Sequence, residues 1–329
     1  MSRLRFGVVG CGAISTFYQL PAIRHCSQVD LVAVVDTDLA WAQSVARRFG
    51  VRAAFASYRD LIGHVDAALV ATPNHTHADI ACGLLQAGVH VLCEKPMSST
   101  RAEVERMFDV ATRSGARLMA AHCLRFSPNL ALLKQAIATG WLGDVRELSG
   151  GIGGRYESGT QRTDFRRQKQ LAGGGVLLDL GIHLIDLAMW LVADHPVNVA
   201  YESTRAAEWE VETDAEVALE FGTGVRAMLA SSFTRTLESA LTVRGTAGWA
   251  TAALYRPTDL TFFSRSARLC QHAGVQQLQL ADESMYDGQI AHFCHAVQSG
   301  NEFAVRADEV RGVIDVIERC YRQQEAHAA

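Results

Sequence analysis

A histidine and an aspartate interrupt the apolar segment GGGVLLDLGIHLID, residues 173–186. Asp179 and His183 are four residues apart, so a helix would present both on one face while the leucines pack behind them. The pKa of an imidazole lies near neutral pH, so this pair could move a proton to or from a bound molecule. A histidine inside an apolar helix is more often a core residue, and Asp179 could be its buried partner. The spacing alone leaves both interpretations open.

A glycine turn near the start of the chain could hold phosphate groups. In the segment GVVGCGAIS, Gly10 and Gly12 occupy the first two positions of a GxGxxG motif, and Ser15 stands at the third. The turn follows a strand and precedes a helix, which is the context that the motif requires. Asp36 ends the next strand, where a carboxylate accepts ribose hydroxyls and repels a 2′-phosphate. The pattern predicts a dinucleotide site that favours NAD over NADP.

Alternating strands and helices must position these residues. The apolar, β-rich runs are residues 4–10, 29–36, 66–72, 89–95 and 116–122, and the helical segments between them are 14–26, 38–50, 77–88 and 101–115. Continuous apolar strands that alternate with helices indicate a parallel sheet covered on both faces. We therefore predict an α/β fold whose residues 1–123 form an N-terminal Rossmann domain with a doubly wound parallel sheet.

The pattern changes after residue 128. A helix at 128–139 comes first, and two helices at 286–299 and 307–324 close the chain. Between them lie strand-like stretches, several of which are joined by turns that contain glycine. These stretches are 144–154, 197–207, 214–222, 224–233, 239–245 and 249–254. This indicates a C-terminal α+β domain over residues 124–329, with a large, mostly antiparallel open sheet. The last helices have room to pack back on the first domain. Because an open sheet leaves one face uncovered, we expect a homodimer or homotetramer that forms through it.

Composition excludes several classes of protein. The 329 residues carry a net charge of −4 and are 49% hydrophobic, so we expect no nucleic-acid partner. No uninterrupted apolar run is long enough to span a membrane, and no signal peptide is evident, so we expect no membrane association. The eight cysteines form no CxxC pair, which predicts reduced thiols in the cytoplasm rather than disulfides or a zinc site.

Four motifs together resemble one known family. They are GVVGCGAIS, ATPNHTH (71–77), CEKP (93–96) and GGGVLLDLGIHLID, and the chain is similar over nearly its whole length to the glucose–fructose oxidoreductase/inositol dehydrogenase (Gfo/Idh/MocA) family. EKP combined with DxGxH is more specific than the glycine turn alone. The resemblance implies an NAD(P)-binding Rossmann domain and a C-terminal α/β domain with an open sheet. Its members mostly oxidise a secondary alcohol of a sugar or cyclitol, or reduce the ketone.

The resemblance also implies roles for particular residues. Lys95, Asp179 and His183 match the family's catalytic positions. The expected cofactor-binding residues are Gly10, Gly12, Ala13, Ile14, Asp36, Thr37, Thr72, Pro73, Asn74, His77, Glu94 and Lys95. The expected substrate-binding residues are Lys95, Arg125, Arg166, Asp179 and His183. The match is less clear for Arg125, whose role stays open. Arg166 is a candidate because it lies in the basic run 162–170, which could approach a phosphorylated or nucleotide-linked sugar; a solvated basic loop is at least as good an interpretation of that run.

The chemistry of these residue types fits alcohol oxidation. His183 would take the hydroxyl proton, Lys95 would polarise the reacting oxygen and help keep His183 neutral, and Asp179 would orient the substrate. The histidines of ATPNHTH and His122 fit no standard metal-ligand spacing, so we expect no metal. Two alternatives stay open: a ketoreductase of sugar or aminosugar biosynthesis, and a non-catalytic dinucleotide-sensing regulator.

Overall fold

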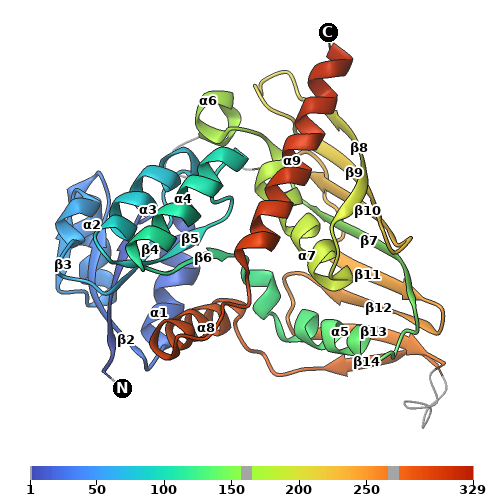
Figure 1. The fold of residues 1–329 in the computed structure, drawn as a ribbon, viewed down its shortest axis with the longest axis horizontal. Coiled ribbons are helices and arrows are strands. Elements are labelled where there is room, and N and C mark those ends of the chain that lie inside the picture. The colour runs from blue at the N-terminus through green and yellow to red at the C-terminus, as the bar shows by residue number, and fades with distance from the viewer. Residues whose placement is uncertain (1, 157–164, 266–273, 329) are drawn as a thin grey trace. The chain divides into compact units, whose positions relative to one another are not determined.

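The computed structural model describes residues 2–156, 165–265 and 274–328 (Figure 1). The chain divides into two compact units. The first consists of Met1–His122, Ser158–Gly173 and Tyr286–Arg311, and the second of Cys123–Glu157, Gly174–Met285 and Gly312–Ala329. The chain thus leaves the first unit after residue 122 and returns to it twice.

A parallel sheet forms the centre of the first unit. Its strands lie in the order β3-β2-β1-β4-β5-β6, and every neighbouring pair is parallel. The strands are β1 (Leu4–Val9), β2 (Val29–Val35), β3 (Ala53–Phe55), β4 (Ala67–Val70), β5 (His90–Glu94) and β6 (Leu118–Ala121). Every residue of β4 and β6 is buried, as expected for strands covered on both faces. The predicted Rossmann sheet is confirmed, with β3 as an additional short edge strand.

Helices follow the strands of this unit in alternation. They are the π-helical turn η1 (Ser15–Gln19), α1 (Leu20–His25), α2 (Leu39–Phe49), the 3₁₀ turns η2 (Tyr58–Leu61) and η3 (Asn74–Thr76), α3 (His77–Gln86), α4 (Arg101–Ser114), the 3₁₀ turn η6 (Phe165–Arg167), α6 (Lys169–Ala172) and α8 (Met285–Ser299). The Asp38 carboxylate caps α2 by accepting a 3.0 Å hydrogen bond from the Trp41 amide. On α8, Phe293 packs edge-on against Phe6 of β1, with ring centroids 6.1 Å apart. A helix close to the end of the sequence therefore belongs to the core of the first unit.

An eight-stranded sheet forms the second unit, in the order β14-β13-β12-β11-β7-β10-β9-β8. The strands are β7 (Val145–Gly153), β8 (Pro196–Thr204), β9 (Asp214–Phe221), β10 (Arg226–Ser232), β11 (Ala240–Gly245), β12 (Gly248–Ala253), β13 (Asp259–Ser264) and β14 (Gln276–Gln279). Only the β7–β10 pair is parallel, so the predicted mostly antiparallel sheet is confirmed.

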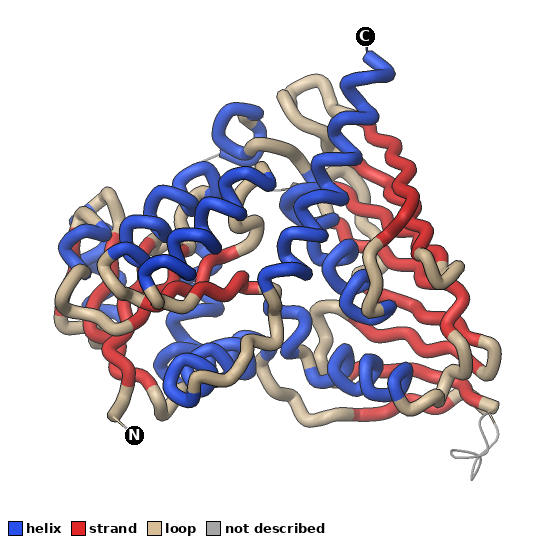
Figure 2. The backbone as a smooth tube through the Cα atoms, in the orientation of Figure 1, coloured by secondary structure: helices blue, strands red, loops and turns tan. Residues whose placement is uncertain are grey.

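Helices cover one face of the second sheet (Figures 1 and 2). They are α5 (Pro128–Ala138), α7 (Ile182–Val192) and the part of α9 (Ala307–Ala328) that follows residue 311; two short turns, η4 (Cys123–Phe126) and η7 (Leu177–Gly181), precede α5 and α7. The apolar residues of β9, from Ala215 to Phe221 at every second position, are buried, while Glu216 and Glu220 between them are exposed. The apolar side of β9 is thus covered within the second unit itself.

A long apolar helical stretch within the described residues lies mostly in the interior. Lys169–Val192 is long and apolar enough to cross a membrane by length and composition, but 78% of its most apolar window is buried within the protein. Core helices of globular proteins have the same composition. This stretch contains η7 and α7, which carry Asp179 and His183.

Candidate active site

The glycine turn follows β1 directly, and the surroundings of its two glycines differ. Gly10 has a φ of +99°, and a Cβ atom there would lie 2.4 Å from the carbonyl oxygen of Ala71. A Cβ at Gly12 would meet nothing within 4 Å. Gly10 is therefore required by the neighbouring strand, whereas Gly12 borders open space. Open space at a turn before the N-terminus of a helix is where the pyrophosphate of a dinucleotide binds in a Rossmann fold.

Asp36 is tied to this turn by backbone hydrogen bonds. One carboxylate oxygen accepts from the Cys11 amide at 3.1 Å, and the other accepts from the Asp38 amide at 3.0 Å. The Trp41 indole donates to the carbonyl oxygen of Cys11 at 2.8 Å and holds the turn from its other side. The carboxylate is only half-buried, so it is held in place and still has access to a ligand. Beside it, Thr37 is exposed.

The helix after the turn begins with a wide π-helical turn. Ala13 is exposed and Ile14 is half-buried just before it. The hydroxyl oxygen of Ser15 and the amide oxygen of Gln19 are buried without a hydrogen-bond partner within the protein. These two atoms, one turn apart, are buried acceptors that a bound ligand or water could satisfy.

Several polar side chains of the segment Thr72–His77 form hydrogen bonds within the protein. The Asn74 amide donates to the carbonyl oxygen of Ala172 in α6 at 2.6 Å, and His75 contacts the carbonyl oxygen of Leu171 at 2.9 Å. His77 is 1% exposed, and its two ring nitrogens lie 2.9 Å from the Pro96 carbonyl oxygen and 2.8 Å from that of Thr72. Burial lowers the pKa of His77, and the two carbonyl oxygens oppose the shift.

These contacts bear differently on two residues that were expected to line the cofactor. Both ring nitrogens of His77 lie against carbonyl oxygens of the protein. Asn74 uses its amide nitrogen on α6, while its buried amide oxygen has no hydrogen-bond partner within the protein. Thr72 and Pro73 are half-buried, with the Thr72 hydroxyl 2.7 Å from that of Thr76. Within this segment only His77 is buried, so the residues from Thr72 to Thr76 all keep some surface.

The EKP motif lies where β5 ends. Glu94 is 6% exposed and accepts hydrogen bonds from the Gln19 side-chain amide at 2.5 Å and from the Lys95 backbone amide at 3.2 Å. The Lys95–Pro96 peptide bond is cis, and the Lys95 side chain is half-buried. Glu94 thus joins the helix after the glycine turn to the strand end that carries Lys95, and its carboxylate is engaged within the protein.

In the second unit, Asp179 and His183 lie at the start of a buried helix. Asp179 is in the π-helical turn η7 and is half-buried, and His183 is in the first turn of α7 and is 7% exposed. Wide π-turns inside helices occur frequently at functional sites. Side chains four residues apart lie on one side of a regular helix.

Two residues that the sequence did not indicate hold the start of this helix. The Glu212 carboxylate accepts from the amides of Gly175 at 3.0 Å and Leu177 at 3.1 Å. The Tyr321 hydroxyl donates to the same carboxylate oxygen at 2.9 Å. Glu212 lies 35 and more residues from its helix partners, and no local motif marks such a contact.

Arg125 has a different place from the one expected. Its guanidinium donates two hydrogen bonds to the Asp186 carboxylate, at 3.0 and 2.6 Å, and both side chains are 2% exposed. This buried ion pair corrects the expectation that Arg125 contacts substrate, because its charge is used inside the second unit. It also explains Asp186, the third polar residue of GGGVLLDLGIHLID.

The last candidates from the sequence are Arg166, a metal site and the cysteines. Arg166 lies on η6 in the first unit, half-buried, with its guanidinium 4.9 Å from the ring centroid of Phe165. Within residues 2–156, 165–265 and 274–328, no three His, Cys, Asp or Glu side chains gather as metal ligands. The seven cysteines in those ranges are free thiols.

Comparisons with known proteins agree with this arrangement. Residues 4–122 match the model of an oxidoreductase family with an NAD-binding Rossmann fold, and residues 130–251 match the Gfo/Idh/MocA C-terminal domain. The chain belongs to the Gfo/Idh/MocA family of oxidoreductases. The expected NAD(P)-dependent oxidoreductase, with a dinucleotide as its cofactor, is thereby confirmed.

Individual relatives are named for alcohol oxidation. The chain is 34% identical to the trans-1,2-dihydrobenzene-1,2-diol dehydrogenase of Mus musculus, over 78% of this chain and 77% of that protein. It is 28% identical to D-xylose 1-dehydrogenase (NADP(+)) 2 of Haloferax volcanii, over 99% of each. Among solved structures, the aldose-aldose oxidoreductase of Caulobacter crescentus, complexed with glycerol, superposes with a TM-score of 0.89 at 24% identity and covers 97% of both chains. That likeness shows the shared fold.

Proposed function

We propose that the protein transfers hydride between a secondary alcohol of a sugar, sugar derivative or cyclitol and NAD. The observation that carries this proposal is the pair Asp179 and His183, one turn apart at the start of a buried helix, in a chain of an oxidoreductase family. The relatives named for a diol and for D-xylose support a substrate with neighbouring hydroxyl groups. The first unit would bind the dinucleotide, and the second would supply the acid/base pair.

Asp36 supports NAD as the preferred cofactor. Its two oxygens are held by the amides of Cys11 and Asp38, where they can accept the two hydroxyls of a ribose. A 2′-phosphate would meet a fixed negative charge there. The haloarchaeal relative is named for NADP(+), so this preference is proposed from the residues of this chain alone.

The chain's own side chains would manage the proton and the developing charge. The nicotinamide, when bound, accepts or supplies the hydride. His183 removes the hydroxyl proton as the carbonyl forms, because a neutral imidazole is a competent base near pH 7. The Lys95 ammonium donates a hydrogen bond to the reacting oxygen and stabilises its negative charge. Asp179 accepts a hydrogen bond from a neighbouring substrate hydroxyl and fixes the orientation. Arg166 would contact only substrates that carry phosphate.

A substrate panel followed at 340 nm tests the proposal. We expect turnover of at least one of D-xylose, D-glucose, myo-inositol and a trans-dihydrodiol, faster with NAD+ than with NADP+. His183→Asn and Lys95→Ala should each lower kcat by roughly 100-fold or more. Lys169→Ala, an exposed lysine on α6, is the matched control and should stay within about twofold of the wild type.

Two results would contradict the proposal. Near-normal turnover in His183→Asn or Lys95→Ala would show that the roles are misassigned. Tight NAD+ binding without turnover of any member of a broad polyol panel would favour a dinucleotide-sensing regulator instead.

We propose further that two copies of the chain pair through the open face of the second sheet. Charges alternate across it: Glu220 pairs in register with Arg226, Arg226 with Glu147, and Glu147 with Arg244, all of them exposed. A row with both signs can meet a copy of itself across a two-fold axis. A cytoplasmic location is also proposed, supported by the free thiols in the described ranges.

A further inference from the structure

The first amides of the helix that carries Asp179 and His183 are capped by one distant residue. Glu212 lies in the connection before β9 and is 5% exposed. Its carboxylate accepts from the amides of Gly175 and Leu177, and its backbone carbonyl oxygen accepts from the Val176 amide at 3.0 Å. Three consecutive amides that no intrahelical carbonyl can satisfy are thus all bonded to Glu212.

The last helix of the chain reaches the same point. Tyr321 on α9 donates its hydroxyl hydrogen to the carboxylate oxygen of Glu212 that also accepts from Gly175 and Leu177. Three hydrogen-bond donors therefore meet at this one oxygen. Because all of these residues belong to the second unit, the arrangement is complete within it.

Glu212 and Tyr321 explain the last two residues of the triple glycine, Gly174 and Gly175. A Cβ at Gly174 would lie 2.1 Å from the Tyr321 hydroxyl oxygen, and a Cβ at Gly175 would lie 2.0 Å from the Glu212 carbonyl oxygen. Real Cβ atoms do not approach other atoms so closely. Gly174 and Gly175 are thus required by the protein's own packing, and a substrate need not be invoked for them.

The Glu212 carboxylate lies at the N-terminus of the helix that begins with η7. A carboxylate at a helix N-terminus interacts favourably with the partial positive charge of the helix. Burial raises the pKa of Glu212, while the hydrogen bonds from Tyr321 and the two amides act in the opposite direction. Leu177, whose amide is bonded to Glu212, stands two residues before Asp179 and six before His183. A shift of the first turn would therefore move both side chains together.

We propose that Glu212 and Tyr321 are positioning residues that hold the first turn of η7, and with it Asp179 and His183, in the geometry that proton transfer requires. This inference rests on the proposed function, because it assigns the held side chains to catalysis. A displacement of about 1 Å in a reacting group costs on the order of 100-fold in rate. The two residues would thus affect turnover without touching the substrate.

Three variants and one control test the inference with NAD+ and the panel member that is turned over fastest. Glu212→Ala should lower kcat by roughly 10- to 100-fold with the KM for NAD+ unchanged. Glu212→Gln, whose amide oxygen still accepts, should recover most of that loss, and Tyr321→Phe should lower kcat about threefold. Gln323→Ala removes a different α9 contact, a 2.7 Å bond to the carbonyl oxygen of Val199, and should leave kcat within about twofold.

Hydrogen–deuterium exchange supplies a measurement that does not depend on turnover. Exchange at the amides of residues 175–177 should speed up in Tyr321→Phe and Glu212→Gln but not in Gln323→Ala, since only the first two loosen the cap. These two variants carry the test if Glu212→Ala fails to fold. Unchanged exchange in both would overturn the inference.

The kinetic outcomes separate this inference from the proposed function. An inactive His183→Asn together with a normal kcat in Glu212→Ala would overturn the inference alone. A normal kcat in His183→Asn would overturn the proposed function first. An equal loss of kcat in Gln323→Ala and Tyr321→Phe would show that α9 supports the fold in general and does not position the helix.

Discussion

The polar side chains in and near α7 include a buried ion pair that supports the fold, besides Asp179 and His183, which are proposed to act in catalysis. In the Arg125–Asp186 pair, both carboxylate oxygens and two guanidinium nitrogens are matched, and the Arg125 guanidinium also lies 5.7 Å from the Trp190 ring. A buried ion pair stabilises little relative to apolar residues, but removing one partner leaves an unpaired charge in the interior. Asp186 thus matters for folding, whereas His183 one turn earlier is proposed to serve the reaction.

At this scale we predict that Asp186→Ala destabilises the protein by about 3–5 kcal/mol, because Arg125 is left buried without its partner. Thermal unfolding should show a Tm lower by roughly 10 °C. The double variant Arg125→Met/Asp186→Leu removes both charges and should recover most of the loss. Equal Tm values for the single and the double variant would contradict this interpretation of the pair.

Secondary-structure elements were largely predictable, because their apolar periodicity is local. The helices at 286–299 and 307–324 were expected within a few residues of α8 and α9. The short strands β3, β13 and β14 were not expected, since runs such as AAF and QQLQ carry no strand signal of their own. The contacts of Glu212 and Tyr321 could not be predicted either, because they join residues that only the tertiary structure brings together.

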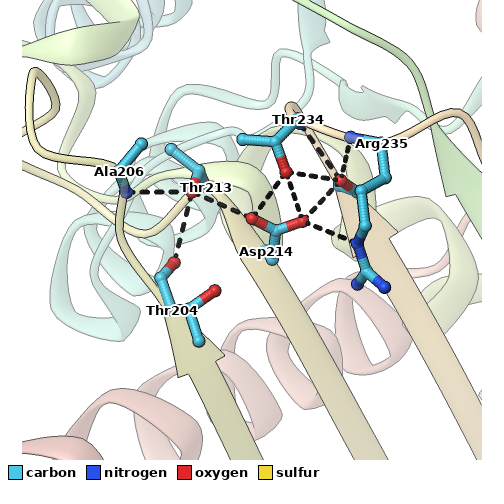
Figure 3. Close-up of polar contacts among 7 residues, drawn as sticks. Thr204, Ala206, Thr213, Asp214, Thr234 and Arg235 are labelled. Atoms are coloured by element: carbon cyan, nitrogen blue, oxygen red, sulfur yellow. Dashed lines mark hydrogen bonds and ion pairs between the residues drawn. The ribbon is translucent and has the colours of Figure 1, made fainter.

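A polar cluster fastens β9 to the end of β10 (Figure 3). Asp214, the first residue of β9, accepts hydrogen bonds from the hydroxyls of Ser232, Thr234 and Thr213 and from the Arg235 guanidinium. Burial alone would raise the pKa of Asp214, but these four donors together lower it below its ordinary value. The folded protein therefore favours the charged carboxylate more than the unfolded chain does.

The sign of the pH dependence follows from that lowered pKa. The stabilisation is fully present above the unfolded-state pKa of about 3.9 and is lost as the pH falls through the lower folded-state pKa. Asp214→Asn should thus lower Tm by a few degrees between pH 5 and 7, with a difference from the wild type that shrinks below about pH 4. Asp144→Asn, in an exposed pair with Arg146, should change Tm by less than about 1 °C. A pH-independent effect of Asp214→Asn would contradict the assigned cause.

At the scale of the whole molecule, the open face of the second sheet is where a second copy is proposed to bind. Met228 of β10 is 52% exposed and pairs in register with Ser149 and Ala218, so a large apolar side chain stands among small ones. The large apolar side chains on the other face of these strands, such as Leu219 and Leu229, are buried within their own unit. Sequence alternation showed that one face is apolar, but it could not show which face the helices cover.

Met228→Arg should therefore shift the protein toward the monomer, because the new charge would be buried at the centre of the contact. Light scattering coupled to size exclusion measures the mass directly. Ile62→Glu, at a 42% exposed position in the first unit, is the control and should keep the wild-type mass. A monomeric wild-type protein, or an unchanged dimer in Met228→Arg, would contradict pairing through this face.

The most direct test of hydride transfer follows the transferred atom. The fastest substrate of the panel, deuterated at the carbon that bears the reacting hydroxyl, is incubated with NAD+, and the reduced cofactor is examined by NMR. We predict one deuterium at C4 of the nicotinamide ring, with formation at least about 100-fold slower in His183→Asn. Reduced cofactor without deuterium at C4, or with the same rate in His183→Asn, would contradict direct hydride transfer assisted by His183.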